Sequence, residues 1–128
     1  MEKIYSFKNE LPEETKFIMA IRKEDAMILL FDNPTQKMQM AAVRRNPSAA
    51  QYIQYPTQKV QTFLLSRSPY HIKYIHNASE GTIMKFLEIM KAEPNKSERR
   101  KMKECFEKSE ASEFLSNEIK LFMELIEI

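Results

Sequence analysis

The chain has 128 residues, a formal net charge of +2, one glycine and one cysteine. This length suits a single domain, and the composition excludes an intramolecular disulfide framework, a multi-cysteine zinc site and the glycine-rich phosphate-binding loops. No apolar run approaches the roughly 20 residues of a membrane span, and the first residues lack a signal-peptide pattern. We therefore expect a cytoplasmic protein with no membrane partner.

An internal repeat organises the chain. The tetrapeptide Pro-Thr-Gln-Lys at 34–37 recurs at 56–59, a shift of 22 residues, and the same shift carries the Tyr-Ile pair at 52–53 onto 74–75. Repeats of this kind stack so that neighbours share one core. We predict an all-α, single-domain fold over 1–128, a solenoid-like array of four short helical hairpins. The units are 12–33, 34–55, 56–77 and 78–95.

Each unit is predicted to contain two helices. The first helices are expected at 34–45 and 56–67, with Asn33 as the N-cap before Pro34, and Asn77 with Glu80 repeats this signal in the fourth unit. The second helices are expected at 47–53 and 69–76, where Pro47 and Pro69 supply the start signals. The pattern leaves open whether the fourth unit keeps its second helix.

The C-terminal third departs from the repeat. A charged helix is expected over 97–108 and an amphipathic helix over 113–126, and together they would form a cap covering 97–128. Repeat arrays need such a terminal cap with a polar outer face. The alternative for the last helix is homodimerisation through its apolar face, which comprises Phe114, Leu115, Ile119, Phe122 and Ile126.

A family resemblance accompanies the second unit. Residues 33–46 read Asn-Pro-Thr-Gln-x-Met-Gln-x-Ala-Ala-Val-x-x-Asn, followed by Ala49 and the pair at 52–53. This string resembles tandem short-hairpin repeats of uncharacterised bacteriophage and bacterial proteins, with a consensus like Asn-Pro-Ser-x-x-Val-Gln-x-x-Ala-Val-x-x-Asn. The resemblance covers residues 12–90, although the third unit has Leu64-Leu65 for Ala-Val and Tyr55 at the cap. It implies a helical array and a phage origin, and it implies no catalytic residues.

The distribution of charge is uneven. Residues 34–77 contain six basic residues and no Asp or Glu. Because repeats place equivalent positions beside one another, we expect one basic ridge at the hairpin turns, formed by Arg22, Lys23, Arg44, Arg45 and Arg67. Lys37 and Lys59 would form a second ridge near the helix starts. The helix dipole also favours basic residues in last turns, but it does not account for the missing acids. A functional basic face would attract an acidic partner.

Two tyrosines extend the candidate surface. Tyr55 and Tyr70 replace smaller residues in their repeat columns and are contact candidates, whereas Tyr52 and Tyr74 occupy a column that faces the core. The candidate partner-binding residues are Arg22, Lys23, Lys37, Arg44, Arg45, Tyr55, Lys59, Arg67, Tyr70, His71 and Lys73.

Because repeat faces commonly bind proteins, an acidic protein partner is favoured over nucleic acid. With a phage origin, the expected function is inhibition or modulation of a host defence or nucleic-acid-handling protein in the host cytoplasm. The alternatives are a nucleic-acid-binding accessory protein and an assembly protein that self-associates through its C-terminal helix.

Catalytic chemistry has little support in the sequence. His71 and His76 are five residues apart, so they do not share a helix face, and no acidic residue lies nearby in sequence to complete a metal site. Cys105 lies on the apolar side of its helix, where a small buried hydrophobe is the ordinary role. We expect no enzyme activity, no cofactor and no metal.

Overall fold

The structure is a computed structural model that describes Thr15, Ile18, Ile28, residues 31–113 and residues 115–125. These residues form helices and loops without a strand, which confirms the all-α prediction. In chain order, with η for a 3-10 helix, the elements are α3 (Gln36–Arg45), η2 (Pro47–Tyr52), α4 (Gln58–Arg67), η3 (Pro69–Tyr74), α5 (Glu80–Ala92), α6 (Lys96–Glu107), η4 (Glu110–Ser112) and α7 (Asn117–Leu125). In the part of the chain described, every helix is too short or too polar to cross a membrane.

The first helices of the second, third and fourth units each start at a hydroxyl N-cap. Thr35, Thr57 and Ser79, spaced 22 residues apart, accept hydrogen bonds from the backbone N–H groups of Met38, Val60 and Thr82. The predicted caps Asn33 and Asn77 were therefore wrong by two residues. Each hydroxyl satisfies a helix N–H that has no partner within the helix, so the helix begins just after it. Asn77 instead adopts the left-handed region, with φ of 51°.

In the second and third units, the second helix is a 3-10 helix. Pro47 and Pro69 occupy the first positions, as predicted, and the side chains of Asn46 and Ser68 cap them by accepting from Ser48 N and Tyr70 N. Both helices have six residues. This short length is typical of 3-10 helices, whose hydrogen-bond geometry is poorer than that of α-helices.

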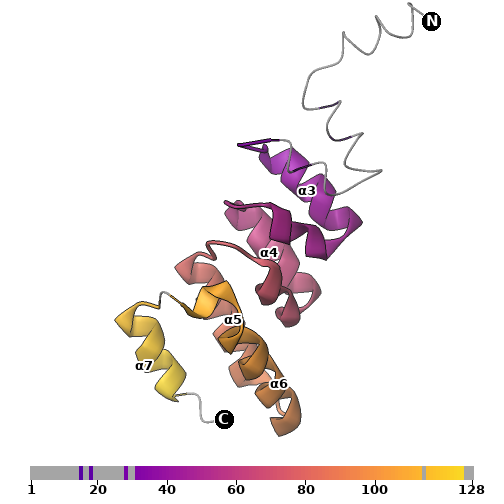
Figure 1. Cartoon of the computed structure of the whole chain (residues 1–128). Coiled ribbons are helices and arrows are strands. Elements are labelled where there is room, and N and C mark those ends of the chain that lie inside the picture. Colours follow the sequence, from indigo (N-terminus) through magenta and orange to yellow (C-terminus); the bar gives the residue numbers. More distant parts are fainter. Residues whose placement is uncertain (1–14, 16–17, 19–27, 29–30, 114, 126–128) are drawn as a thin grey trace, which may run out of the picture.

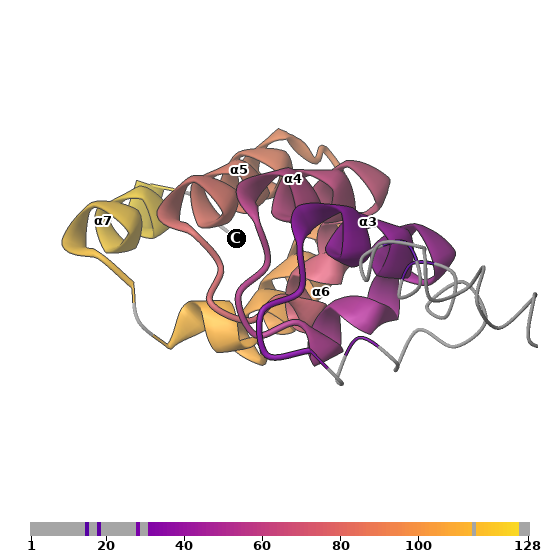
Figure 2. The same ribbon diagram turned by 90° about the horizontal axis from the view of Figure 1, so that it is seen from above.

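The helices form two layers. Contacts join α3 to α4 and α4 to α5, while η2 and η3 contact each other beneath them. Figure 1 shows α3 and α4 following one another, and Figure 2 shows α3, α4 and α5 along one side of the molecule with α6 on the other. Small and branched apolar side chains fill the space between the layers; Ala42, Val43, Ala49, Ala50, Val60, Leu64 and Ile72 are fully buried. The alanines let the neighbouring helices approach closely.

The C-terminal elements complete both layers. Helix α6 packs against η3 and α5, and α7 packs against α5. Thus α5 is followed by an α-helix of 12 residues where the earlier units have a short 3-10 helix. The rings of Phe86 and Phe106 stack with their centroids 5.3 Å apart and join α5 to α6.

The last helix starts later than predicted. Residues 110–112 form η4, and the Ser116 hydroxyl accepts from Ile119 N, so α7 begins at Asn117 and not at residue 113. The predicted first unit lies largely outside the described residues, as do Phe114 and Ile126. The four-unit solenoid-like array therefore stays a prediction.

Candidate partner-binding surface

Two buried glutamines fix the relative positions of the helices that carry the candidate residues. The Gln61 side-chain amide donates to the Pro56 carbonyl at 3.0 Å and accepts from Ser79 N at 2.9 Å. Gln39 does the same one unit earlier, donating to the Pro34 carbonyl at 3.1 Å and accepting from Thr57 N at 2.9 Å. We call these two residues the glutamine clamps. Each ties the start of its own helix to the start of the next.

The sequence pattern indicates the glutamine clamps, although they were not predicted above. Gln39 and Gln61 are only 3% and 4% exposed, yet each follows an apolar residue at the same repeat position. A polar side chain that recurs in a buried column needs hydrogen-bond partners, since an unpaired buried amide is costly. The equivalent position of the fourth unit is Ile83, so the clamp pattern ends there.

The predicted basic ridges of the second and third units lie on adjacent helices. Arg44 and Arg45 are exposed in the last turn of α3, and Arg67 is exposed in the last turn of α4. The Arg67 guanidinium lies 5.2 Å from the centroid of the Phe63 ring, which orients its charge. Lys37 and Lys59 are exposed near the starts of the same two helices. Arg22 and Lys23 lie outside the described residues.

Four of these cations surround one hollow. A groove of about 520 Å³ is lined by Gln36, Lys37, Met40, Ala41, Arg44 and Arg45 of α3, by Lys59 of α4, and by Ile18. We call it the α3 groove. Its described lining combines cationic side chains with an apolar floor and contains no carboxylate. Repeat equivalence predicted the cations but not the hollow between them.

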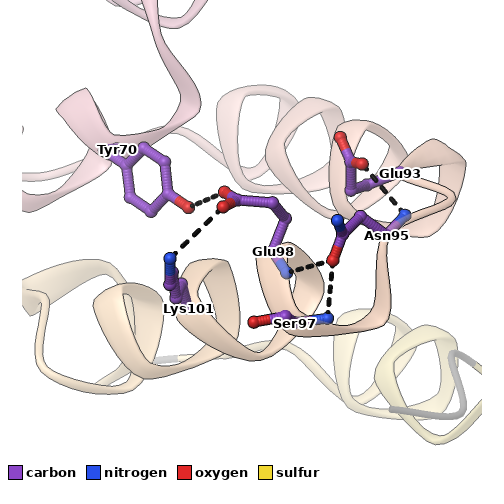
Figure 3. A network of polar contacts seen from close by, with 6 residues as sticks. All are labelled: Tyr70, Glu93, Asn95, Ser97, Glu98 and Lys101. Atoms are coloured by element: carbon purple, nitrogen blue, oxygen red, sulfur yellow. Dashed lines mark hydrogen bonds and ion pairs between the residues drawn. The ribbon is translucent and has the colours of Figure 1, made fainter.

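The tyrosine candidates lie away from the α3 groove. Tyr55 is 68% exposed and lines a different hollow of about 460 Å³, together with Asp32 and Gln54. The half-buried Tyr70 donates its hydroxyl to Glu98 of α6 at 2.8 Å, as Figure 3 shows. This hydrogen bond, with burial, raises the pKa of Tyr70 to about 12 and also lowers the pKa of Glu98. Tyr70 therefore joins η3 to α6.

The start of α6 places Glu98 for this contact. The Asn95 side chain caps the helix by accepting from the backbone N–H groups of Ser97 and Glu98 at 2.9 and 3.1 Å. Glu98 then lies between Tyr70 and Lys101, whose ammonium is 3.4 Å from the second carboxylate oxygen (Figure 3). The carboxylate is thus held by the polar network of α6 as well as by η3.

The other two candidates of η3 also have contacts within the chain. His71 Nδ1 lies 2.8 Å from the Leu64 carbonyl oxygen, and because that oxygen can only accept, the ring nitrogen donates. The exposed Lys73 ammonium lies 5.1 Å from the centroid of the Tyr74 ring. Neither residue lines the α3 groove, so the structure does not bring η3 together with Lys37, Arg44 and Lys59 around that groove.

His76 joins three segments through both of its ring nitrogens. Nδ1 lies 2.6 Å from Glu110 Oε2, and Nε2 lies 2.7 Å from the Gln51 carbonyl oxygen. Two acceptors require two N–H donors, so both contacts are hydrogen bonds only when the ring is protonated on both nitrogens. Burial lowers the pKa of His76, but the hydrogen bonds to Glu110 and Gln51 raise it by more than burial lowers it. The net shift of the His76 pKa is therefore upward. His76 in turn lowers the pKa of Glu110.

Within the described part of the chain, no three His, Cys, Asp or Glu side chains gather as a metal site. Cys105 is half-buried and its thiol donates to the Tyr70 carbonyl at 3.6 Å, while burial raises the pKa of that thiol. Of the residues proposed for dimerisation, Ile119 is buried inside the chain, and Leu115 and Phe122 are half-buried against the core. The large exposed apolar side chains of α7 are Leu121 and Leu125.

Comparison of the chain with protein-family models, with curated proteins and with solved structures found no match. Function is therefore argued from the charges, contacts and cavities of the described residues. Among these features, the cationic surface of α3 and α4 combines exposure, fixed spacing and the absence of acidic residues from 34–77.

Proposed function

We propose that the chain is a solenoid-like helical repeat protein that binds an acidic surface of another protein and catalyses no reaction. The contact is made by a basic face that comprises Lys37, Arg44, Arg45, Lys59 and Arg67. The observation that carries the proposal is the exposure of these five cations on two adjacent helices, in a segment with no carboxylate of its own. Such a surface steers an acidic partner and selects against basic ones.

The glutamine clamps support this proposal. Because Gln39 bonds to a backbone group at the start of the next unit, it sets the distance between the starts of α3 and α4, and Gln61 does the same for α4 and α5, in both cases without any charged side chain. A rigid array of charges loses less conformational entropy on binding than a flexible one. The Gln39 clamp therefore fixes the relative positions of the two helices that carry these cations.

The sequence resemblance extends the proposal to the biological setting. On that resemblance, the protein is phage-encoded and acts in the host cytoplasm by occupying a host defence or nucleic-acid-handling protein. Binding of this kind is stoichiometric and needs no chemistry from the chain itself.

The test is capture of a partner from bacterial lysate, run with and without nuclease and at low and moderate salt. A variant with Arg44→Glu, Arg45→Glu and Arg67→Glu is expected to lose a protein that the unmodified chain retains. The matched control carries Lys85→Glu, Lys96→Glu and Arg100→Glu, the same charge change at exposed positions outside the basic face. Circular dichroism checks that both variants remain helical.

Two outcomes would reject the proposal. Retention of the same protein by the reversed variant would show that the basic face is not the contact. Capture of nucleic acid that disappears with nuclease or with rising salt would instead support the nucleic-acid-binding alternative, since phosphate contacts release counterions.

A further inference from the structure

The outer face of α7 is apolar at its centre and acidic at its sides. Leu121 and Leu125 are 61% and 75% exposed and lie one turn apart on the helix. Glu118 and Glu124 are also exposed, and each is three residues from Leu121, so the two carboxylates flank that side chain. Neither carboxylate forms an ion pair with another residue that the structure describes. We call these four residues the α7 stripe.

The outer face of α4 has the complementary pattern. Lys59, Phe63 and Arg67 are spaced i, i+4 and i+8, so a cation lies on each side of a half-buried aromatic ring. Both cations are exposed, and among the described residues neither has an ion-pair partner. We call these three residues the α4 stripe. It is aromatic at its centre and cationic at both ends.

We propose that the α4 stripe binds the α7 stripe of a second copy of the chain, so that copies associate head to tail. The two stripes have opposite charges, and the apolar centre of one meets the apolar centre of the other. Helix α5 contacts both α4 and α7 and lies between them, so the contact is made between copies (Figure 2). A heterologous contact of this kind generates a ring or an open chain of copies.

This inference goes beyond the proposed function and concerns the same helix. Lys59 and Arg67 belong both to the α4 stripe and to the basic face. A second copy and an acidic partner therefore compete for α4, and self-association would limit the number of chains that can bind the partner.

The positions of the charges fit an antiparallel contact of the two helices. At 1.5 Å per residue, Lys59 and Arg67 are about 12 Å apart along α4. Glu118 and Glu124 are about 9 Å apart along α7, a difference that the long cationic side chains can span. In this arrangement Glu118, in the first turn of α7, meets Arg67, in the last turn of α4. The negative end of one helix dipole then lies beside the positive end of the other.

A symmetric contact between two α7 helices fits these charges less well. It would gather the four carboxylates of two α7 stripes around the leucines, and like charges in one contact oppose binding. Lys120 is the one cation of α7, and it lies off the stripe because it is two residues from Glu118. On the α4 stripe the same carboxylates meet cations.

The test measures the apparent mass of the full chain by sedimentation velocity. The concentration series runs from roughly 10 to 500 μM, since contact between two single helices is at the weak end of protein interfaces. The apparent mass is expected to rise with protein concentration. Added salt should lower it, because the ion pairs of the contact are screened.

Charge reversal on either stripe should prevent the contact, and mixing the two variants should restore it. One variant carries Glu118→Lys with Glu124→Lys, and the other carries Lys59→Glu with Arg67→Glu. Each alone is expected to associate at least about tenfold more weakly than the unmodified chain, because stripes of like charge then face one another. An equimolar mixture should recover the association, since every contact between the two variants again joins a cationic stripe to an acidic one.

Two further variants separate the contact from general effects of charge and folding. Leu121→Ala keeps every charge at an exposed position and should weaken association about fivefold, because apolar burial is lost. The control Lys96→Glu with Arg100→Glu, at exposed positions of α6, changes the net charge as much as reversal of the α4 stripe does. It should change association by less than about twofold. Circular dichroism checks that all variants remain helical.

Three results would overturn the inference. The first is an unmodified chain that stays monomeric at every concentration. The second is unchanged association of the Lys59→Glu, Arg67→Glu variant, which would place the contact elsewhere. The third is a mixture of two helical variants that associates no better than either alone.

Failure of this inference is separable from failure of the proposed function. If the unmodified chain stays monomeric but captures a protein that the variant reversed at Arg44, Arg45 and Arg67 loses, the basic face stands as the partner site. The second copy is then not an occupant of α4.

Discussion

The carboxylate-free segment 34–77 and the C-terminal segment 96–125 hold their neighbours by different chemistry. Within the first, Gln39 and Gln61 connect successive units through neutral amides. The second reaches back to η3 and the residues after it through two carboxylates, Glu98 on Tyr70 and Glu110 on His76. The neutral clamps use no charged side chain of α3 or α4, whereas the C-terminal contacts use the carboxylates of Glu98 and Glu110.

The difference indicates where the molecule can respond to its surroundings. An amide hydrogen bond between Gln61 and backbone groups has no titrating partner, so its strength does not depend on pH or salt. The contact between His76 and Glu110 involves two titrating groups: the hydrogen bonds raise the pKa of His76 above 6.5, and the contact with His76 lowers the pKa of Glu110 below 4.5. Substitutions that remove an amide clamp and substitutions that remove a carboxylate contact should therefore lower the free energy of unfolding by different amounts. The pH dependence of the two losses should also differ.

The largest effect is expected from Phe106→Ala. Phe106 is fully buried and stacks on Phe86, so the substitution removes apolar contact and leaves a cavity between α5 and α6. We expect a loss of about 3 to 5 kcal/mol in the free energy of unfolding, measured by urea denaturation. The control Leu121→Ala, at an exposed position, should change it by less than about 0.5 kcal/mol. A small loss in Phe106→Ala would mean that carboxylate contacts, and not apolar burial, hold the C-terminal segment.

A smaller effect is expected from Gln61→Met. Methionine keeps the approximate shape of the side chain but leaves the Pro56 carbonyl and Ser79 N without their partner. Two unpaired groups of this kind should lower the free energy of unfolding by about 2 to 3 kcal/mol. The exposed Gln36→Met is the control. The loss should be the same at acidic and neutral pH, and a pH-dependent loss would contradict the assignment of the clamp as uncharged.

The repeat period predicted the helices well because each start has a local cause. The Asn46-Pro47 and Ser68-Pro69 pairs begin the 3-10 helices where expected. The cap of α3 was misassigned because Asn33 and Thr35 are both good capping residues and flank the same proline. Only the structure shows that the Thr35 hydroxyl accepts from Met38 N.

The candidate surface was predictable only in part. Repeat equivalence brought Arg45 and Arg67 to corresponding helix ends, but the α3 groove depends on how Met40 and Ala41 pack, which periodicity does not specify. The contacts of Glu98 and Glu110 join residues 28 and 34 positions apart and belong to no repeat. A single sequence contains no local signal for such pairs.

The smallest effect in this comparison is expected from Glu110→Gln, and its pH dependence is the informative part. His76 has a folded pKa above its ordinary 6.5, so its contribution to stability is complete below pH 6.5 and is lost as pH rises through the folded value. Glu110 has a folded pKa below 4.5, so its contribution is present above pH 4.5 and is lost as pH falls through the folded value. The contact is therefore strongest between these two limits.

Glu110→Gln should lower the free energy of unfolding by less than about 1 kcal/mol, because both side chains are 40% exposed to solvent. The difference from the unmodified chain should be largest near pH 5.5, between the two ordinary pKa values, and should shrink as pH rises to the alkaline side. The exposed Glu113→Gln serves as the control for removal of one negative charge. A difference that stays constant as pH rises through the alkaline range would mean that Glu110 contributes by accepting from Asn77 N and not through the charge of His76.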